Sequence, residues 1–312
     1  MFYINCVSAQ QVKVGIIGLD TSHSIAFTKA MNDPKATGNL EFCQVVAAYP
    51  HGSRDIESSV SRIPKYTEQI SGMGVKIVDS IPELLELVDA VLLETNDGRP
   101  HLEQVLPVLK AGKPVFIDKP IAGSLEDAIK IFQASTEYQI PIFSSSSLRF
   151  GKTTQEARSG KYGEIVYCET TSPASIEKTH PDLFWYGIHG VESLFTVMGT
   201  GCQSVKRSTT EDGKIKVVGR WEGDRTRLGV FTEGKGYVGK ATNLEGEVHE
   251  VGSYDGYGPL VAAIADYFIT GVAPVTPAET LEIYAFMEAA DESKRQGGAE
   301  VTLQEVMKLS AP

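Results

Sequence analysis

The architecture of this chain follows from one stretch, Val12-Lys13-Val14-Gly15-Ile16-Ile17-Gly18-Leu19-Asp20-Thr21-Ser22-His23-Ser24. An apolar run stops at Gly18, and a short polar turn then leads into Ile25-Ala26-Phe27, where a helical segment begins. A buried parallel strand, a tight turn and a helix N-terminus in this order open a βαβ unit. The free N–H groups and the dipole of such a helix start attract anions such as phosphate. We therefore expect a ligand site at this turn.

Strands and helices alternate strictly through the first half of the chain. The apolar runs after the first strand predict strands over 43–49, 75–78, 90–94 and 114–118. Between them, the pattern predicts helices over 24–31, 81–87 and 102–111, and a further helix beginning near 125. Each strand is too apolar to have a solvated face, which is typical of a parallel sheet covered by helices on both sides. We predict an α/β fold with an N-terminal Rossmann-like, doubly wound parallel sheet, whose ligands bind at the carboxyl ends of the strands.

Beyond about residue 150 the pattern changes to β-rich segments separated by short Gly, Asp and Asn turns. These segments predict strands over 165–171, 214–221, 227–231, 237–242 and 248–253, accompanied by helices over 186–198, 260–269 and 278–294. They indicate an α+β domain with a mostly antiparallel, open sheet. We expect residues 1–123 to form the nucleotide-binding domain and residues 124–312 a domain for substrate binding, with the cleft between the two.

The composition excludes several classes of partner. A formal net charge of −11 over 312 residues argues against binding to nucleic acid or to an anionic membrane. No apolar run reaches the ~18 residues that a membrane span needs. The four cysteines, Cys6, Cys43, Cys168 and Cys202, are scattered without a CxxC pair, and we expect them to pack as small hydrophobic side chains. No Cys/His cluster has metal-ligand spacing, so the sequence predicts no metal site.

The first ten residues lie outside the first strand and leave the compartment open. They are apolar and include the small-residue stretch Val7-Ser8-Ala9. They fit either the end of a signal peptide or a frayed N-terminal leader. The first interpretation implies an exported, periplasmic protein, and the second a cytoplasmic one.

The turn matches a dinucleotide fingerprint only in part. If Gly18 is the first glycine of G-x-G-x-x-G, Asp20 and His23 occupy the other two positions, and a carboxylate in place of the second glycine repels a pyrophosphate. Hydroxyl donors and an imidazole nearby offset this repulsion. Two interpretations stand: a dinucleotide site built from Gly15, Gly18, Asp20, Thr21, Ser22 and His23, or a structural cap in which Asp20 satisfies helix N–H groups.

Other loops at the same sheet edge supply further cofactor contacts. No acid ends the second strand to hold a ribose diol, and Ser53 and Arg54 follow instead. This combination favours a 2′-phosphate and hence NADP over NAD, although an ordinary exposed loop explains it equally well. Thr95 and Asn96 follow the fourth strand and complete the predicted cofactor site. His101 is expected to orient that loop from the start of its helix.

Lys119 and His189 are the predicted catalytic residues. Lys119 emerges with Pro120 at the carboxyl end of the last central strand and so points at the ligand edge. His189 lies on a predicted helix between Gly187 and Gly190, and imidazole is the best-matched proton acceptor near neutral pH. A histidine bonded to the neighbouring Glu192 is the alternative. The predicted substrate contacts are Arg149, His180, Asp182 and Tyr186.

Taken together, these motifs resemble the Gfo/Idh/MocA oxidoreductases. The resemblance rests on Val14–Gly18, on His101-Leu102-Glu103, on the segment from Ala111 to Pro120, which is its most specific part, and on Tyr186–His189. It implies a Rossmann domain that binds NAD or NADP and a second domain whose sheet often mediates homo-oligomerisation. It also implies that Lys119 and His189 assist hydride removal from a sugar or polyol. Relative to the family, Asp20 replaces a glycine, Asp118 a glutamate, and Trp185 and Glu192 two acids beside the histidine.

The sequence leaves three functions open. The leading one is an NAD(P)-dependent oxidoreductase of a sugar, cyclitol or related polyol. The resemblance also allows a glycoside hydrolase that retains its nucleotide, oxidising, eliminating and re-reducing its substrate without net redox change. The departures at Asp20 and Trp185 allow a non-catalytic protein that binds a nucleotide or sugar.

Overall fold

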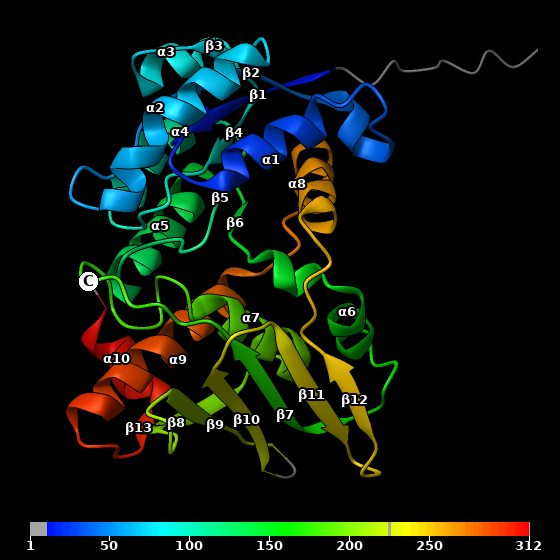
Figure 1. Ribbon diagram of the computed structural model, residues 1–312, viewed down its shortest axis with the longest axis vertical. Helices are drawn as coiled ribbons and strands as arrows, with labels where there is room; N and C mark the ends of the chain where they lie inside the picture. Colours follow the sequence, from blue (N-terminus) through cyan, green and yellow to red (C-terminus); the bar gives the residue numbers. More distant parts are fainter. Residues whose placement is uncertain (1–10, 224–225, 312) are drawn as a thin grey trace, which may run out of the picture.

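The computed structural model describes residues 11–223 and 226–311, and it arranges them as two β-sheets one above the other along the long axis of the molecule (Figure 1). Residues 1–10, on which the leader interpretation and Cys6 depend, lie outside the described residues. Within the described ranges, no helix combines the length and the apolar character that a membrane span requires.

The N-terminal sheet is parallel throughout and has the strand order β3-β2-β1-β4-β5-β6. Its strands are β1 (Val12–Ile17), β2 (Cys43–Tyr49), β3 (Lys76–Ile77), β4 (Ala90–Leu93), β5 (Val115–Ile117) and β6 (Ile142–Phe143). Every residue of β4 and β5 is buried, which is why these strands lack alternation in the sequence. The doubly wound parallel sheet is confirmed.

Among the described residues, five α-helices connect these strands, and three of them begin at a side chain that caps the helix. The five helices are α1 (Ser22–Met31), α2 (Glu57–Gly72), α3 (Ile81–Leu85), α4 (His101–Lys110) and α5 (Leu125–Tyr138). Ser80 and Ser124 accept hydrogen bonds from backbone N–H groups at the starts of α3 and α5. The sequence patterns missed α2, because its N-cap Ile56 makes no side-chain cap and Pro64 lies inside the helix.

The parallel sheet extends past the expected domain boundary at residue 123. Strand β6 pairs with β5, so the N-terminal layer continues to residue 143. The chain also returns to this layer later: α8 (Gly258–Thr270) packs its buried residues Leu260 and Ile264 into the same core as Val14 and Ile16. The two layers are therefore joined by more than one chain crossing, and a single boundary at 123 does not describe them.

The second sheet has the order β12-β11-β7-β10-β9-β8-β13, and all its pairs except β7 with β10 are antiparallel. The mostly antiparallel sheet is thus confirmed. Its strands are β7 (Ile165–Ser172), β8 (Cys202–Thr209), β9 (Ile215–Trp221), β10 (Arg227–Glu233), β11 (Val238–Asn243), β12 (Val248–Val251) and β13 (Val301–Thr302). Strand β8 was not predicted, because only one of its faces is buried and most of its residues are polar, so its sequence shows no clear apolar run.

Helices cover the second sheet on the side toward the N-terminal layer (Figure 1). They are α6 (Lys152–Arg158), α7 (Ile188–Met198), α9 (Pro277–Arg295) and α10 (Leu303–Leu309), with a short 3₁₀ helix, η2 (Ser147–Phe150), at the junction and another, η1 (Gly38–Phe42), in the first layer. Every residue of α7 is buried. Any polar side chain on α7 must therefore find its partner inside the protein.

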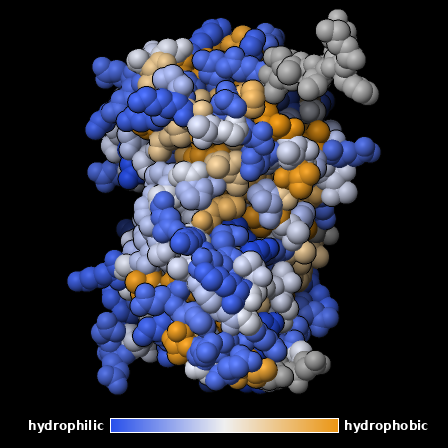
Figure 2. Space-filling model, turned by 90° about the vertical axis from the view of Figure 1, so that its right-hand side faces the viewer, coloured by the Kyte–Doolittle hydropathy of each residue, from blue (hydrophilic) through white to orange (hydrophobic). Residues whose placement is uncertain are grey.

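The remaining thiols and the surface agree with the composition. Cys43, Cys168 and Cys202 are free and buried, as expected of small hydrophobic residues. Polar residues cover most of the face shown in Figure 2, and the apolar ones gather mainly in its upper half, at the level of the parallel sheet.

Candidate functional site

A cavity of about 300 Å³ lies where the carboxyl edge of the parallel sheet meets the second layer. Both layers contribute to its wall, which makes it the natural candidate site. The lining residues are Thr21, Ser22, His23, Ser58, Arg62, Asn96, Lys119, Ser147, Leu148, Trp185, Tyr186, His189, Tyr237, Tyr254 and Tyr257.

The turn after β1 brings the start of α1 to this cavity. Gly18 has φ +98°, and a Cβ there would lie 2.3 Å from the Thr95 backbone nitrogen, so only glycine fits between β1 and the loop after β4. Thr21 caps α1 by accepting from His23 N. The first turn of α1 thus faces the cavity as a helix N-terminus, the arrangement that binds anions elsewhere.

Asp20 lies beneath the turn and does not face the cavity. Its Oδ2 accepts a hydrogen bond from Ser59 Oγ at 2.5 Å, and its Oδ1 accepts one from the Asn96 backbone nitrogen at 2.9 Å. Burial raises the pKa of the Asp20 carboxyl, and these two bonds oppose the rise. The carboxylate ties the β1 turn to α2 and to the β4 loop. It is absent from the wall against which a phosphate would rest.

Helix α2 contributes two residues that the sequence patterns missed. Ser58 and Arg62 line the cavity, and Arg62 Nη1 lies 3.4 Å from the Asp20 carbonyl oxygen, to which it donates. A guanidinium beside a helix N-terminus favours an anion. The signal that could have revealed them is the helical spacing of Ser59, Ile63 and Ile70. It favours a helix, which would also have included Ser58 and Arg62.

His189 projects from α7 into the opposite side of the cavity. Its Nδ1 lies 2.7 Å from Ser146 Oγ, and the Ser146 backbone nitrogen donates to Glu192 Oε2 at 2.7 Å. Burial, and then the charge of Lys119, lower the pKa of His189 well below its usual value. The imidazole is therefore neutral near pH 7, and its hydrogen-bond partner is a serine. Glu192 does not contact it directly.

Lys119 enters the same cavity from the parallel sheet. It follows β5 directly, in a Lys119–Pro120 peptide that is cis, and its side chain is almost completely buried. Two carboxyl groups, Glu94 and Asp118, lie near it at the ends of β4 and β5, and its ammonium charge favours the ionised form of each. The predicted catalytic pair thus comes together in one cavity from two different layers.

An aromatic wall surrounds His189. The Tyr186 and His189 rings meet edge to face with centroids 5.1 Å apart, and the Tyr186 hydroxyl lies 3.1 Å from that of Tyr237. Trp185, Tyr254 and Tyr257 complete this part of the lining. Rings with hydroxyl groups at their edges suit a ligand that has both C–H and O–H surfaces.

Some predicted site residues therefore reach the cavity. These are Thr21, Ser22, His23, Asn96, Lys119, Tyr186 and His189. Gly18, Asp20 and Thr95 form the turn and loop beneath it, whereas Gly15 lies within β1 and packs against Leu84. His101 is fully buried, with its ring nitrogens 2.7 Å from the Thr95 carbonyl oxygen and 3.2 Å from the Ile121 carbonyl oxygen, so it holds the loop in place.

Three predicted substrate contacts lie elsewhere. Arg149 is 2% exposed, and Glu192 and Glu279 hold its guanidinium at 2.7 Å each. Asp182 pairs with Arg207 and Lys294, and His180 Nε2 lies 3.1 Å from Asp97 Oδ1. None of the three lines the cavity, because each side chain is held by a polar partner elsewhere in the protein. The sequence could not show these partners, since they lie 80 or more residues away or on other elements.

Ser53 and Arg54 line a second hollow, of about 370 Å³, beyond the end of β2. Asp55, Asp97 and Arg99 share it. Ser53 Oγ donates to Asp97, and Arg99 pairs with Asp97 and Asp55 at 2.7 Å each. The hollow therefore contains carboxylates as well as the guanidinium groups that a 2′-phosphate would need.

A dinucleotide fits this edge in its main features. The glycine at position 18 allows close backbone approach, the start of α1 with Ser22 and Arg62 offers donors to phosphate, and Asp20 is turned away. The two hollows lie along the same edge, with Lys119 and His189 at one end and the β2 loop at the other. The residues present thus suit a nucleotide that spans both hollows.

Comparison with known proteins supports the same conclusion. Residues 12–144 match the Gfo/Idh/MocA family model, described as an oxidoreductase family with an NAD-binding Rossmann fold. An uncharacterized oxidoreductase of Streptococcus pneumoniae is 27% identical over 155 residues, which cover 47% of this chain and 42% of that protein. Inositol 2-dehydrogenase 3 of Saccharopolyspora erythraea is 39% identical over 67 residues, covering 21% of this chain and 20% of that protein. The chain spans less than half the length of the curated relatives it matches.

Solved structures share the fold over nearly the whole chain. A probable dehydrogenase from Thermotoga maritima superposes with a TM-score of 0.75 at 19% identity, covering 95% of this chain and all of that one. The myo-inositol dehydrogenase of Lactobacillus casei, solved with NAD(H) and myo-inositol, gives a TM-score of 0.72 at 16% identity, covering 94% and 97%. At these identities the likeness shows the fold.

Proposed function

Because the chain belongs, through residues 12–144, to the Gfo/Idh/MocA oxidoreductases, we propose that it is an NAD(P)-dependent oxidoreductase of a sugar, cyclitol or related polyol. The observation that carries this proposal is that Lys119 and His189, from different layers, line one cavity beside the start of α1. A lysine and a neutral histidine facing each other across a cavity that an alcohol can enter suit the oxidation of that alcohol.

The chain's own residues supply proton transfer and charge stabilisation. In the tautomer that has its proton on Nδ1, His189 donates to Ser146 Oγ, presents a bare Nε2 to the cavity and accepts the proton of the substrate hydroxyl. The ammonium of Lys119 stabilises the oxygen as negative charge develops on it. The chemistry that a bound nicotinamide would supply is acceptance of the hydride from the carbon that carries this hydroxyl. The alcohol would thereby become a ketone or aldehyde.

Ser146, a neutral group, orients the histidine. Its hydroxyl accepts from the Leu148 backbone nitrogen at 3.2 Å, which fixes the oxygen beside the imidazole. Its backbone nitrogen is held in turn by Glu192. A neutral partner stabilises an imidazolium less than a carboxylate does, so the proton accepted by His189 is readily passed on.

We propose NAD as the preferred nucleotide, in place of the NADP suggested by Ser53 and Arg54. In the second hollow, Ser53 is already bonded to Asp97, and Asp55 stands beside it. Carboxylates repel a 2′-phosphate and accept hydrogen bonds from a ribose hydroxyl.

The test starts with the nucleotide. Mass spectrometry of small molecules released from denatured protein, and calorimetric titration with NAD and NADP, should show NAD binding more tightly. Turnover of a panel of inositols and sugars is then followed by nicotinamide absorbance. Lys119→Ala and His189→Asn should each lower kcat/KM by about 10²-fold or more, whereas the surface variant Lys110→Ala should not. Unchanged turnover in both site variants would refute the assignment.

We also propose that a second copy of the chain packs on the outer face of the second sheet. Helices α7 and α9 contact β7 and β8, whereas Val238 and Val248 on β11 and β12 stay 60% and 59% exposed. Apolar strand residues left open on one sheet face favour association. Light scattering should give a molar mass of at least twice 33.8 kDa, the mass of one chain. A molar mass of one chain would contradict the proposal.

A further inference from the structure

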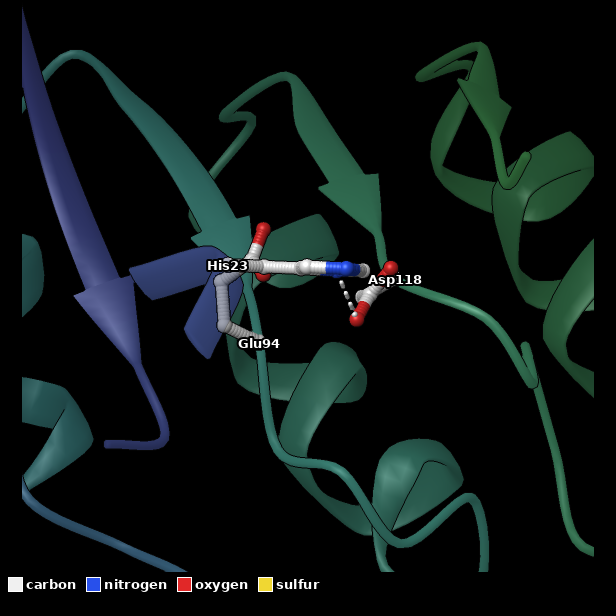
Figure 3. A group of neighbouring side chains, drawn as sticks. All are labelled: His23, Glu94 and Asp118. Carbon is white, nitrogen blue, oxygen red and sulfur yellow. Dashed lines mark hydrogen bonds and ion pairs between the residues drawn. The ribbon is translucent and has the colours of Figure 1, made fainter. Parts of the chain in front are cut away.

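Three ionisable side chains come together at the edge of the parallel sheet: His23, Glu94 and Asp118 (Figure 3). His23 belongs to the first turn of α1, Glu94 follows β4 directly, and Asp118 follows β5 directly. One ligand atom from each lies within 4.8 Å of the other two, and the bond from His23 Nδ1 to Asp118 Oδ2 measures 2.8 Å. Both carboxyl groups are 0% exposed and His23 is 7% exposed.

Three of the four carboxyl oxygens in this cluster lack a hydrogen-bond partner in the part of the chain that the structure describes. Among the described residues, neither oxygen of Glu94 has a hydrogen-bond partner, and Asp118 Oδ1 has none either. A buried ionised carboxylate without a partner is costly, so the site requires a positive charge or a proton. Burial, and then the charge of Asp118, raise the pKa of Glu94 well above its usual value, in keeping with this deficit.

We propose that His23, Glu94 and Asp118 bind a divalent first-row transition-metal cation, with Mn²⁺ and Zn²⁺ as the chemical class. One imidazole and two carboxylates are ligands that these ions accept. At metal–ligand distances of about 2.0–2.2 Å, two ligand atoms on one ion lie at most about 4.4 Å apart. The cluster therefore needs only a small side-chain adjustment to close around an ion.

The charges nearby define the affinity to expect. Two ionised carboxylates match a divalent cation, and Asp20 adds negative charge near Glu94. The ammonium of Lys119 opposes a second cation close by. We therefore expect micromolar binding, with the ion behind the cavity wall that His23 and Lys119 form.

The test uses the full chain after treatment with a chelator and without nucleotide. Calorimetric titration with MnCl₂ and with ZnCl₂ at about pH 8, where proton competition is weak, should give one equivalent of bound metal. Glu94→Gln keeps the size of the side chain and should raise the dissociation constant at least about tenfold. Asp20→Asn is the matched control, because its carboxylate is buried at the same edge but has both oxygens partnered, and it should raise the constant much less than Glu94→Gln does.

Thermal unfolding is a second measurement, and it tests the proposal on the native protein even if a variant folds poorly. Saturating Mn²⁺ or Zn²⁺ should raise the thermal midpoint of the native protein, and Asp118→Asn should remove that rise. Absence of saturable metal binding by the native protein, or equal binding by Glu94→Gln, would overturn the proposal and leave a proton on Glu94 as the occupant. The assay contains neither nucleotide nor polyol, so its failure is separate from failure of the proposed oxidoreductase activity.

Discussion

Replacing Arg149 by methionine tests whether this residue holds the two layers together or binds substrate. The guanidinium is 2% exposed, and its Nε and Nη1 each lie 2.7 Å from a buried carboxylate, of Glu192 and of Glu279. In Arg149→Met both carboxylates stay buried, although Glu192 keeps the Ser145 and Ser146 donors and Glu279 keeps Arg158. Breaking a buried ion pair from one side costs about 3–5 kcal/mol, and we expect the free energy of unfolding to fall by that amount.

Urea unfolding measured by tryptophan fluorescence is the assay, in the background Trp185→Phe, because the remaining indole of Trp221 is 0% exposed and reports loss of the second layer. The double variant Arg149→Met/Glu192→Gln should recover part of the loss, since it removes the charge left without its partner. Arg149 does not line the cavity, so the KM of any substrate should remain within about twofold, a change of under 0.5 kcal/mol. A stability loss below about 1 kcal/mol together with a tenfold rise in KM would show that Arg149 contacts substrate.

Three further perturbations test the turn and the histidine. Gly18→Ala should lower the free energy of unfolding by about 2–5 kcal/mol, because the new Cβ would lie 2.3 Å from backbone at a residue with φ +98°. Gly112→Ala, at φ +70° in open space, should lower it by only about 1–2 kcal/mol. Urea unfolding measures both. Burial lowers the pKa of His189 in the folded state, so just below pH 6.5 the unfolded chain binds more protons than the folded one. The free energy of unfolding should therefore fall as the pH drops through that range. An equal fall in the His189→Asn variant would contradict this explanation. Asp20→Gly should destabilise the fold without tightening NAD binding more than about threefold, under 1 kcal/mol, by calorimetry, because the carboxylate faces away from the cavity.

The sequence predicted the parallel sheet well because strands buried on both faces consist almost entirely of apolar residues. Strands β4 and β5 are apolar without interruption and β1 is interrupted only by Lys13, and no alternative packing hides so many buried residues. Helix α2 was missed for the opposite reason. It lacks a side-chain cap and contains a proline, so its residues resemble a loop. Ser58 and Arg62 were lost with it, and with them the main polar contacts on that side of the cavity.

Site residues were predictable where the backbone alone sets the direction of the side chain. Lys119 follows a central strand, and such a residue reaches the ligand edge whatever its neighbours are. Arg149 and Asp182 depend instead on partners distant in sequence, such as Glu279 and Arg207, and a single sequence gives no sign of those pairings.

The two substitutions that weaken the dinucleotide fingerprint are both compensated within the fold. Asp20 directs its carboxylate to Ser59 and to the Asn96 backbone, and His23 directs its ring to Asp118. Each polar side chain thus bonds to the residues beneath the turn. The start of α1 consequently keeps its free N–H groups and positive dipole toward the cavity, and an anion bound there meets Arg62 before it meets either carboxylate. The charge introduced at position 20 therefore strengthens the support of the turn more than it opposes a phosphate above it.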